Sequence, residues 1–240
     1  MFETMEEMRL QKFLSEQGVL SRRAAEEEIK KGKVKVNGEP AELGAKIDPE
    51  TDVVEYRGQR IGGAVRKVYL MLNKPVGYVT TMSDEKGRPC VAELVENVGT
   101  RVYPIGRLDL ESEGLLLFTN DGELANRLMH PKYHKPKIYH VKIRGEVEAE
   151  KIEALGRPMV IDGYRTKPAG ISVITRKQDY TVLAMELFEG RNRQIRKMCE
   201  QLSLHILTLK RISIGDVKLG NLALGEWRYL TKAQVESLKK

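Results

Sequence analysis

The sequence predicts an α+β protein in which a small N-terminal module precedes a larger domain, built on a mixed, mainly antiparallel sheet with flanking helices. Near the N-terminus, two short helical patterns precede a hairpin pattern. After residue 67, alternating strand-like segments outnumber helical ones, and short turns join most of them. A chain of 240 residues with 41% hydrophobic residues is long enough for both parts to bury a core. We therefore predict a module over 8–56, a linker over 57–67 and a main domain over 68–240.

The predicted module begins with two short helices. Apolar residues recur at helical spacing before Gly18, a residue suited to the left-handed position that ends a helix. Ser21 is a favoured N-cap for a second helix over 22–31. The free N–H groups at this helix start, together with Arg22 and Arg23, would form a seat for phosphate. A solvated helix face is the alternative explanation of these charges.

A hairpin and one further strand complete the module. Lys33 leads into a strand over 34–36, and the Asn37-Gly38 pair favours a two-residue hairpin turn. Another strand is expected over 53–56. Residues 57–67 contain three glycines and little apolar periodicity, which is typical of a linker.

In the main domain, runs of strand-forming residues bounded by turn residues predict most of the sheet. Pro75 ends the first of them, because proline cannot continue a central strand. Period-two alternation over 138–143 places Tyr139 on the core side with Val141. The expected strands cover residues 68–72, 78–81, 114–118, 138–143, 159–161, 166–169, 170–175, 180–187, 206–214 and 227–230.

Helices are predicted where apolar residues recur at helical spacing between these strands. Asp121 can cap the helix over 123–129. A basic loop over 132–137 follows it. Another helix begins near Arg191 with dense positive charge, although Ile195 and Met198 indicate that one of its sides is packed. The other expected helices cover 91–96, 148–155 and the residues after 231.

The turn that leads into the strand over 114–118 carries more charge than a turn needs. It places Arg107 and three acids, Asp109, Glu111 and Glu113, around glycines. A solvated surface turn would explain such charge in a protein that is 31% charged. An acid in a glycine-flanked turn is also a candidate catalytic group, and it draws support from the Arg-rich helix downstream.

Composition and absent motifs narrow the function. The net charge of +7 and the pI of about 9.3 indicate an acidic partner, either nucleic acid or an anionic surface. Two distant cysteines indicate neither a zinc site nor a disulfide framework. The first eight residues do not read as a signal peptide, and no run is long enough to span a membrane, so we expect a soluble, cytoplasmic protein. The common phosphate-loop, dinucleotide, zinc-protease and acyl-transfer motifs are absent.

Two resemblances build on these residues. The combination of Ser21-Arg22-Arg23 with the hairpin over 32–38 resembles the S4 RNA-binding module. Three ordered segments resemble the active-site motifs of RNA pseudouridine synthases: Gly106-Arg107-Leu108-Asp109, Lys137-Ile138-Tyr139 and residues 190–196. Residues 73–77 and the S4-like module are similar to the RsuA/RluB branch, and residues 114–119 and 122–131 are most similar to its large-subunit enzymes.

The second resemblance implies an activity. A specific uridine in large-subunit ribosomal RNA would be detached at N1, turned and rejoined through C5, without a cofactor or a metal. Asp109 matches the nucleophile, and attack at the ribose C1′ or at pyrimidine C6 both remain open. Arg196 matches the arginine that pairs with that acid and keeps it ionised. Tyr139 matches the tyrosine that stacks on the base, and Ile195 matches the opposite wall.

The remaining implied roles concern RNA binding. Arg107 matches the residue that fills the place of the flipped base. Lys137 and Arg193, with Arg22, Arg23 and Lys33 in the module, are candidates for phosphate contacts. Glu111 and Glu113 lie off the motif and are interpreted as solvated or structural. We expect a monomer whose partner is ribosomal RNA.

Three alternatives remain at this point. The chain could be a non-catalytic RNA-binding or ribosome-assembly factor with the same fold, although a pure binder does not need an acid facing RNA phosphates. It could be a synthase that acts on small-subunit RNA. A glycosidase with paired carboxylates is the third, and it would not explain the S4-like module.

Overall fold

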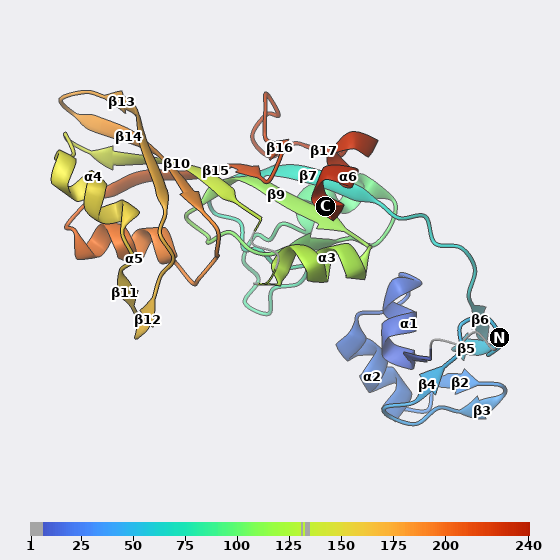
Figure 1. Cartoon of the computed structure of the whole chain (residues 1–240). Helices are drawn as coiled ribbons and strands as arrows, with labels where there is room; N and C mark the ends of the chain where they lie inside the picture. The colour runs from blue at the N-terminus through green and yellow to red at the C-terminus, as the bar shows by residue number, and fades with distance from the viewer. Residues whose placement is uncertain (1–6, 131, 133–134) are drawn as a thin grey trace. The chain divides into compact units, whose positions relative to one another are not determined.

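The structure, a computed structural model, describes residues 7–130, 132 and 135–240. Part of the predicted basic loop over 132–137 and most of the first eight residues therefore lie outside the described residues. The chain divides into two compact units, 1–67 and 68–240 (Figure 1). Each unit has its own buried core.

The helices of the first unit lie where they were predicted, although α2 ends one residue before the predicted end. Helix α1 covers Leu10–Glu16 and α2 covers Arg22–Lys30. Ser21 caps α2, because its side-chain oxygen accepts a hydrogen bond from the backbone N–H of Ala24 at 3.1 Å. Leu10, Leu14 and Ile29 pack into one cluster between the helices and the strands.

The strands of the first unit form a small sheet in the order β3-β2-β5-β6 and a separate pair, β1-β4. Strand β6 (Gln59–Ile61) lies inside the predicted linker, which is a correction. Arg57 and Gly58 both have positive φ, so they turn the chain back and pair β6 with β5. The other strands are β1 (Met8–Arg9), β2 (Val34–Val36), β3 (Glu39–Pro40), β4 (Lys46–Ile47) and β5 (Val54–Tyr56).

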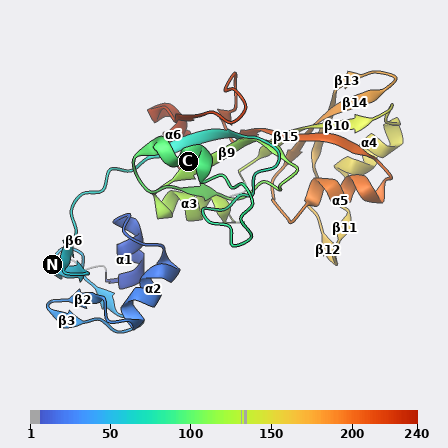
Figure 2. The same ribbon diagram turned by 180° about the vertical axis from the view of Figure 1, so that it is seen from behind.

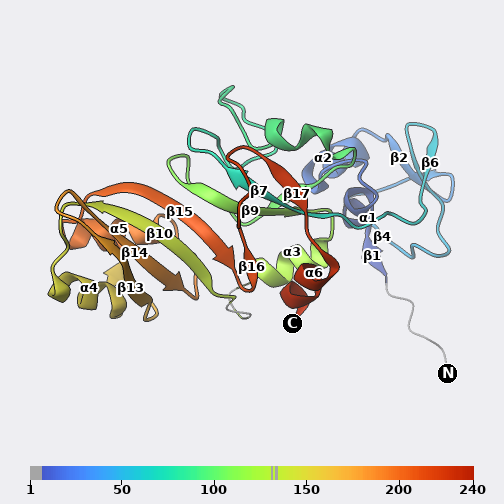
Figure 3. The same ribbon diagram turned by 90° about the horizontal axis from the view of Figure 1, so that it is seen from above.

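The second unit is built on one nine-stranded sheet, which Figure 3 shows from above. Its main path runs β13-β14-β10-β15-β9-β7-β17, while β8 pairs with β9 and β16 with β15. Only the β15-β9 pair is parallel among the described residues, so the predicted mixed, mainly antiparallel sheet is confirmed. The strands are β7 (Tyr69–Lys74), β8 (Tyr103–Ile105), β9 (Glu113–Thr119), β10 (Lys137–Arg144), β13 (Gly170–Arg176), β14 (Tyr180–Leu187), β15 (Ile206–Ile214), β16 (Val217–Lys218) and β17 (Trp227–Tyr229).

Strands β9 and β15 approach each other closely at one glycine. A Cβ atom at Gly114 would lie 2.2 Å from the backbone oxygen of Arg211, and Gly114 has a φ of +104°. Both facts require glycine at this position. This close approach joins the two halves of the sheet.

Helices cover the sheet in separate groups. Helices α4 and α5 pack at the β10-β14 end together with the hairpin of β11 and β12 (Figure 2), and α3 contacts α6 beside β9. Apolar residues of the sheet pack under both groups. The bounds are α3 (Gly122–Met129), the 3₁₀ helix η1 (Glu93–Val98), α4 (Ala149–Gly156), β11 (Val160–Ile161), β12 (Tyr164–Arg165), α5 (Gln194–Gln201) and α6 (Lys232–Lys239).

Two predicted strands are wrong. Residues 78–81 form turns and bends, with a single bridge between Val79 and Cys90. The strand expected over 166–169 lies instead at Tyr164–Arg165, because Asp162 and Gly163 make a two-residue turn directly after β11. The helix predicted over 91–96 is the 3₁₀ helix η1, which starts and ends two residues later than predicted.

Candidate active site

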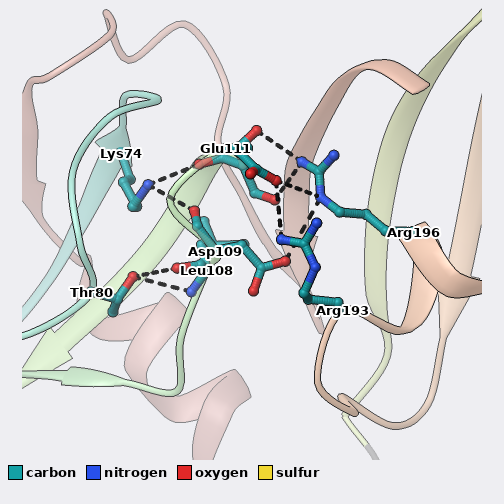
Figure 4. Close-up of polar contacts among 8 residues, drawn as sticks. Lys74, Thr80, Leu108, Asp109, Glu111, Arg193 and Arg196 are labelled. Carbon is teal, nitrogen blue, oxygen red and sulfur yellow. Dashed lines mark hydrogen bonds and ion pairs between the residues drawn. The ribbon is translucent and has the colours of Figure 1, made fainter. Parts of the chain in front are cut away.

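The charged turn over 106–112 connects β8 to β9 and is held from two sides. On one side lies Lys74, at the end of β7, with a fully buried side chain. Its Nζ donates a hydrogen bond to the backbone oxygen of Asp109 at 3.1 Å (Figure 4). It also donates to the backbone oxygens of Pro75 at 3.0 Å and Ser112 at 2.9 Å. An ammonium group has three donors. Two of them are used on this turn, and the third is used on Pro75, the residue after Lys74.

Burial has an electrostatic cost at Lys74. Burial lowers the pKa of the Lys74 ammonium to about 8, and the negative charges of Asp109 and Glu113 oppose that shift only in part. A partly desolvated cation therefore lies directly beneath the backbone of the turn. The only sequence signal for Lys74 is a lysine at the end of an apolar strand, and that signal alone does not place it in the site.

Residues 77–80 hold the same side of the turn. The hydroxyl of Thr80 donates to the backbone oxygen of Leu108 at 2.6 Å and accepts from its N–H at 3.2 Å. The N–H of Gly77 donates to the backbone oxygen of Leu110 at 2.8 Å. Residues 78–81 do not form the predicted strand because Val79 pairs only in a single bridge, in which its N–H donates to the backbone oxygen of Pro89 and its own oxygen accepts from the N–H of Val91.

On the other side, the start of α5 contributes two arginines. Arg196 donates from Nη2 to the backbone oxygen of Glu111 at 2.9 Å and to the Ser112 hydroxyl at 3.2 Å. Its Nε lies 3.8 Å from Oδ2 of Asp109 and 3.7 Å from Oε2 of Glu111. Arg196 is thus shared between two carboxylates, and its contact with Asp109 is an ion pair too long for a hydrogen bond.

Glu111 has a structural role in this arrangement. Arg193 donates from Nη1 to Oε2 of Glu111 at 3.0 Å, and this contact lowers the pKa of the Glu111 carboxyl. Arg193 has a left-handed backbone, with a φ of 52°, at the residue before α5. The side chain predicted to contact phosphate is therefore held by an acid of the turn.

A pocket of about 440 Å³ opens beside the turn. Six of the predicted site residues line it: Arg107, Asp109, Lys137, Tyr139, Arg193 and Ile195. Its volume lies within the usual range for small-molecule sites. Arg196 contacts the turn without lining this pocket.

Tyr139 and Lys137 come from β10. Tyr139 pairs with Arg211 of β15 and Met185 of β14, and its ring packs against apolar clusters of both halves of the domain. Lys137 donates from Nζ to the backbone oxygen of Lys135 at 3.1 Å. Burial, with a smaller contribution from the charge of Arg211, lowers the pKa of Lys137 to about 8.

Other predicted residues lie outside this pocket. Arg22, Arg23 and Lys33 belong to the first unit, where all three side chains are exposed. Among the described residues, no group of three or more His, Cys, Asp or Glu side chains could hold a metal ion. No helix in the described part of the chain is long and apolar enough to cross a membrane.

The chain resembles known proteins over nearly its whole length. Residues 68–201 match the RNA pseudouridylate synthase family, and residues 8–54 match the S4 domain. The chain is 41% identical over 234 residues to the ribosomal large subunit pseudouridine synthase B of Bacillus subtilis, covering 96% of this chain and 95% of that protein. It is also 41% identical over 238 residues to an uncharacterized RNA pseudouridine synthase of Aquifex aeolicus, covering 98% of this chain and 95% of that protein.

A solved structure agrees with these relatives. The crystal structure of a pseudouridylate synthase superimposes with a TM-score of 0.69 at 33% sequence identity, covering 96% of this chain and 99% of that one. With its matching domains and relatives, the chain belongs to the RNA pseudouridine synthases, isomerases that act on RNA, and it carries an N-terminal S4 domain.

Proposed function

We propose that this protein converts one specific uridine of large-subunit ribosomal RNA into pseudouridine, with Asp109 as the nucleophile. The observation that carries the assignment of Asp109 is its place on the wall of a pocket between Tyr139 and Ile195, on a turn fixed from two sides. The choice of large-subunit RNA rests on the Bacillus subtilis relative. One chain supplies every residue of this site, so we propose that the protein acts as a monomer. A ribosomal RNA substrate implies that it acts in the cytoplasm.

The chemistry starts with removal of the target base from its stack, because a paired base hides its reactive atoms. The uracil ring enters the pocket against Tyr139, with Ile195 on the opposite wall. Arg107 is exposed at the pocket and takes the place that the base leaves in the RNA. The carboxylate of Asp109 then attacks either C1′ of the ribose or C6 of the ring.

Either attack leads to the same overall exchange of bonds. The N1–C1′ bond breaks, the ring turns while it is held in the pocket, and a C5–C1′ bond forms. The proton on C5 is then lost, N1 gains a proton, and Asp109 is released as its carboxylate. The guanidinium of Arg196 lies 3.8 Å from the carboxylate of Asp109, so its positive charge attracts the negative charge of the proposed nucleophile.

Basic residues around the pocket and in the S4 domain bind the RNA backbone. Lys137 and Arg193 lie at the pocket. Arg22 and Arg23 lie at the start of α2, and Lys33 lies between the end of that helix and β2. Each phosphate contact increases the salt dependence of binding, by roughly 0.7 to 0.9 in the log–log slope.

The test replaces Asp109 with asparagine. Ribosomal RNA from cells that lack the gene is incubated with each protein, and pseudouridine is mapped by carbodiimide treatment and reverse transcription. Wild type is expected to modify one uridine of the large-subunit RNA, whereas Asp109→Asn binds the RNA but forms no pseudouridine. Asp216→Asn, at an exposed turn, is the matched control and is expected to behave as wild type.

Three outcomes would each contradict a different part of the proposal. Unchanged modification by Asp109→Asn would remove Asp109 from the chemistry. Modification of small-subunit RNA alone would retain the activity and correct the substrate. RNA binding by wild type without any modification would favour the alternative of a non-catalytic assembly factor.

A further inference from the structure

Arg211 is a buried cation in the wall of the same pocket, and the roles assigned above do not include it. It lies in the middle of β15, and only 3% of its surface is exposed. Arginine is rarely this buried unless its charge and donors are paired. The position therefore calls for a specific partner.

The contacts of Arg211 leave one end of the guanidinium without such a partner. Its Nε donates to the backbone oxygen of Leu115 at 2.7 Å. Its Nη2 is buried and has no hydrogen-bond partner among the residues that the structure describes. A buried, charged donor without an acceptor is costly, so a site that keeps one is prepared for an acceptor that arrives later.

The sheet register directs this donor to the place where the base binds. Arg211 is paired with Tyr139 on β10, and paired residues project from the same face of a sheet. On its other side it is paired with Gly114, which has no side chain. Both Arg211 and Tyr139 line the pocket, together with Asp109.

The charges around the pocket indicate what kind of acceptor fits. Lys137 also lines the pocket, and the charge of Arg211 acts on both Lys137 and Lys74. Two acids line the same pocket. Asp109 is the proposed nucleophile, and Glu189 is held by the Tyr164 hydroxyl, the Lys167 N–H and the Gln194 amide. The wall at β15 is therefore positive without a dedicated counter-ion among the described residues.

A backbone phosphate is a poor candidate for this acceptor. The phosphates of a folded RNA stay at the protein surface, where exposed residues such as Arg193 meet them. Arg211 lies deeper, beside Leu209 and Tyr139. A flipped base reaches this depth, and the polar atoms at the edge of uracil include two carbonyl oxygens.

We propose that Arg211 is a further catalytic residue, whose Nη2 donates a hydrogen bond to a carbonyl oxygen of the bound uracil and stabilises the negative charge that the ring acquires during the reaction. This inference rests on the proposed function. If Asp109 attacks C1′, the electron pair of the N1–C1′ bond stays on the ring, and the charge spreads over N1, O2 and O4. If it attacks C6, the electron pair of the C5=C6 bond moves toward O4.

Both routes thus place negative charge on a ring oxygen before C5 bonds to C1′. That bond uses the electron pair again. Loss of the C5 proton and gain of a proton at N1 then give the neutral ring of pseudouridine. A fixed cationic donor at the oxygen lowers the energy of the charged state on either route. The proposed role of Arg211 is therefore the same whether Asp109 attacks C1′ or C6.

The test compares Arg211→Met with Lys210→Met as its matched control. Lys210 is the neighbouring residue on β15, and alternation places it on the opposite face of the sheet. Single-turnover rates are measured at saturating ribosomal RNA from cells that lack the gene, beside the RNA affinity and the melting temperature. Arg211→Met is expected to react about 10² to 10³ times more slowly, the loss typical of removing one such donor, with its RNA affinity nearly unchanged. Lys210→Met is expected to keep the wild-type rate.

Further variants keep the test decisive if Arg211→Met does not fold. Arg211→Lys retains a positive charge, whereas Arg211→Gln retains only a neutral donor, so the lysine variant should react faster than the glutamine variant. Addition of methylguanidinium should partly restore the rate of Arg211→Ala, which a purely structural role would not predict.

The possible failures are distinguishable. If wild type forms no pseudouridine, both the proposed function and this inference are overturned. If wild type is active and the folded Arg211 variants react equally fast, only the role of Arg211 is overturned. A weaker RNA affinity with an unchanged rate at saturation would also overturn it, because Arg211 would then bind RNA without assisting the reaction.

Discussion

Replacement of Lys74 by methionine is expected to weaken the fold and the reaction together. Methionine is similar in length and apolar, so it fills the buried space without donating hydrogen bonds. The three backbone oxygens of Pro75, Asp109 and Ser112 would lose their shared donor. The carboxylate of Asp109 would then be carried by a turn that has lost its support on the side of β7.

Two opposing terms set the size of the loss in stability. Each buried acceptor left without a donor costs about 1–3 kcal/mol, so three of them cost roughly 3–9 kcal/mol. Removal of a fully buried ammonium group also removes its desolvation penalty of several kcal/mol, which stabilises the variant and opposes this loss. The free energy of unfolding should therefore fall by about 3 kcal/mol, near the lower end of the first range.

The effect on the reaction depends on how far the carboxylate of Asp109 is displaced. A displacement of about 1 Å in a reacting group can cost on the order of 10² in rate. We therefore expect the single-turnover rate at saturating RNA to fall about 100-fold, while RNA binding is nearly unchanged because Lys74 is not exposed to the RNA.

Urea unfolding and single-turnover kinetics on the same preparations would measure both effects. Lys218→Met removes the same charge from an exposed position, and it should change the free energy of unfolding by no more than about 0.5 kcal/mol. A folded Lys74→Met protein with the wild-type rate would refute the reasoning, because the turn would then be held without the lysine.

Four further expectations follow from the buried lysines, from Gly114 and from the first unit. Because burial lowers the pKa of Lys74 and Lys137 to about 8, the single-turnover rate should fall as the pH rises through that value, and a flat profile would contradict this. The same lowered pKa of Lys74 means that the folded chain holds fewer protons than the unfolded chain between about pH 8 and about pH 10.4, so urea unfolding should show its contribution to stability rising over that range. Gly114→Ala places a Cβ 2.2 Å from the backbone oxygen of Arg211 and should lower the free energy of unfolding by about 2–4 kcal/mol, whereas Gly190→Ala, with no atom within 4 Å of the added Cβ, serves as the control in the same melts. Removal of residues 1–67 leaves a unit with its own core, so filter binding should detect weaker RNA affinity and a shallower salt dependence while the rate at saturating RNA persists; an unchanged affinity would contradict the role of the S4 domain.

Elements whose signals are local could be predicted from the sequence. Ser21 and Asp121 cap helices at the expected positions, because a cap depends on residues two or three places away. Strand β14 follows its alternating pattern over the whole predicted range. Strand β6 was missed because its polar residues resemble a linker, and only its pairing with β5 makes it a strand.

Features that depend on distant partners could not be predicted in this way. Residues 78–81 have the composition of a strand, yet the Thr80 hydroxyl is used on Leu108, 28 residues away. Lys210 and Arg211 are adjacent cations, and alternation places one of them inside without indicating which. The close approach at Gly114 fixes the register that buries Arg211, and this information lies in another strand.

The contacts of the turn also separate the position of Asp109 from its reactivity. The backbone oxygen of Asp109 accepts hydrogen bonds from Lys74 Nζ and from the N–H of Ser112, whereas its carboxylate accepts none from the described residues. The nearest cation to that carboxylate, Arg196 Nε, lies at 3.8 Å. Strong hydrogen bonds to a carboxylate would stabilise its charge and weaken it as a nucleophile. Since Lys74 belongs to β7 and Arg196 to α5, the two halves of the domain hold the turn from opposite sides and leave the carboxylate oxygens of Asp109 available for the proposed bond formation.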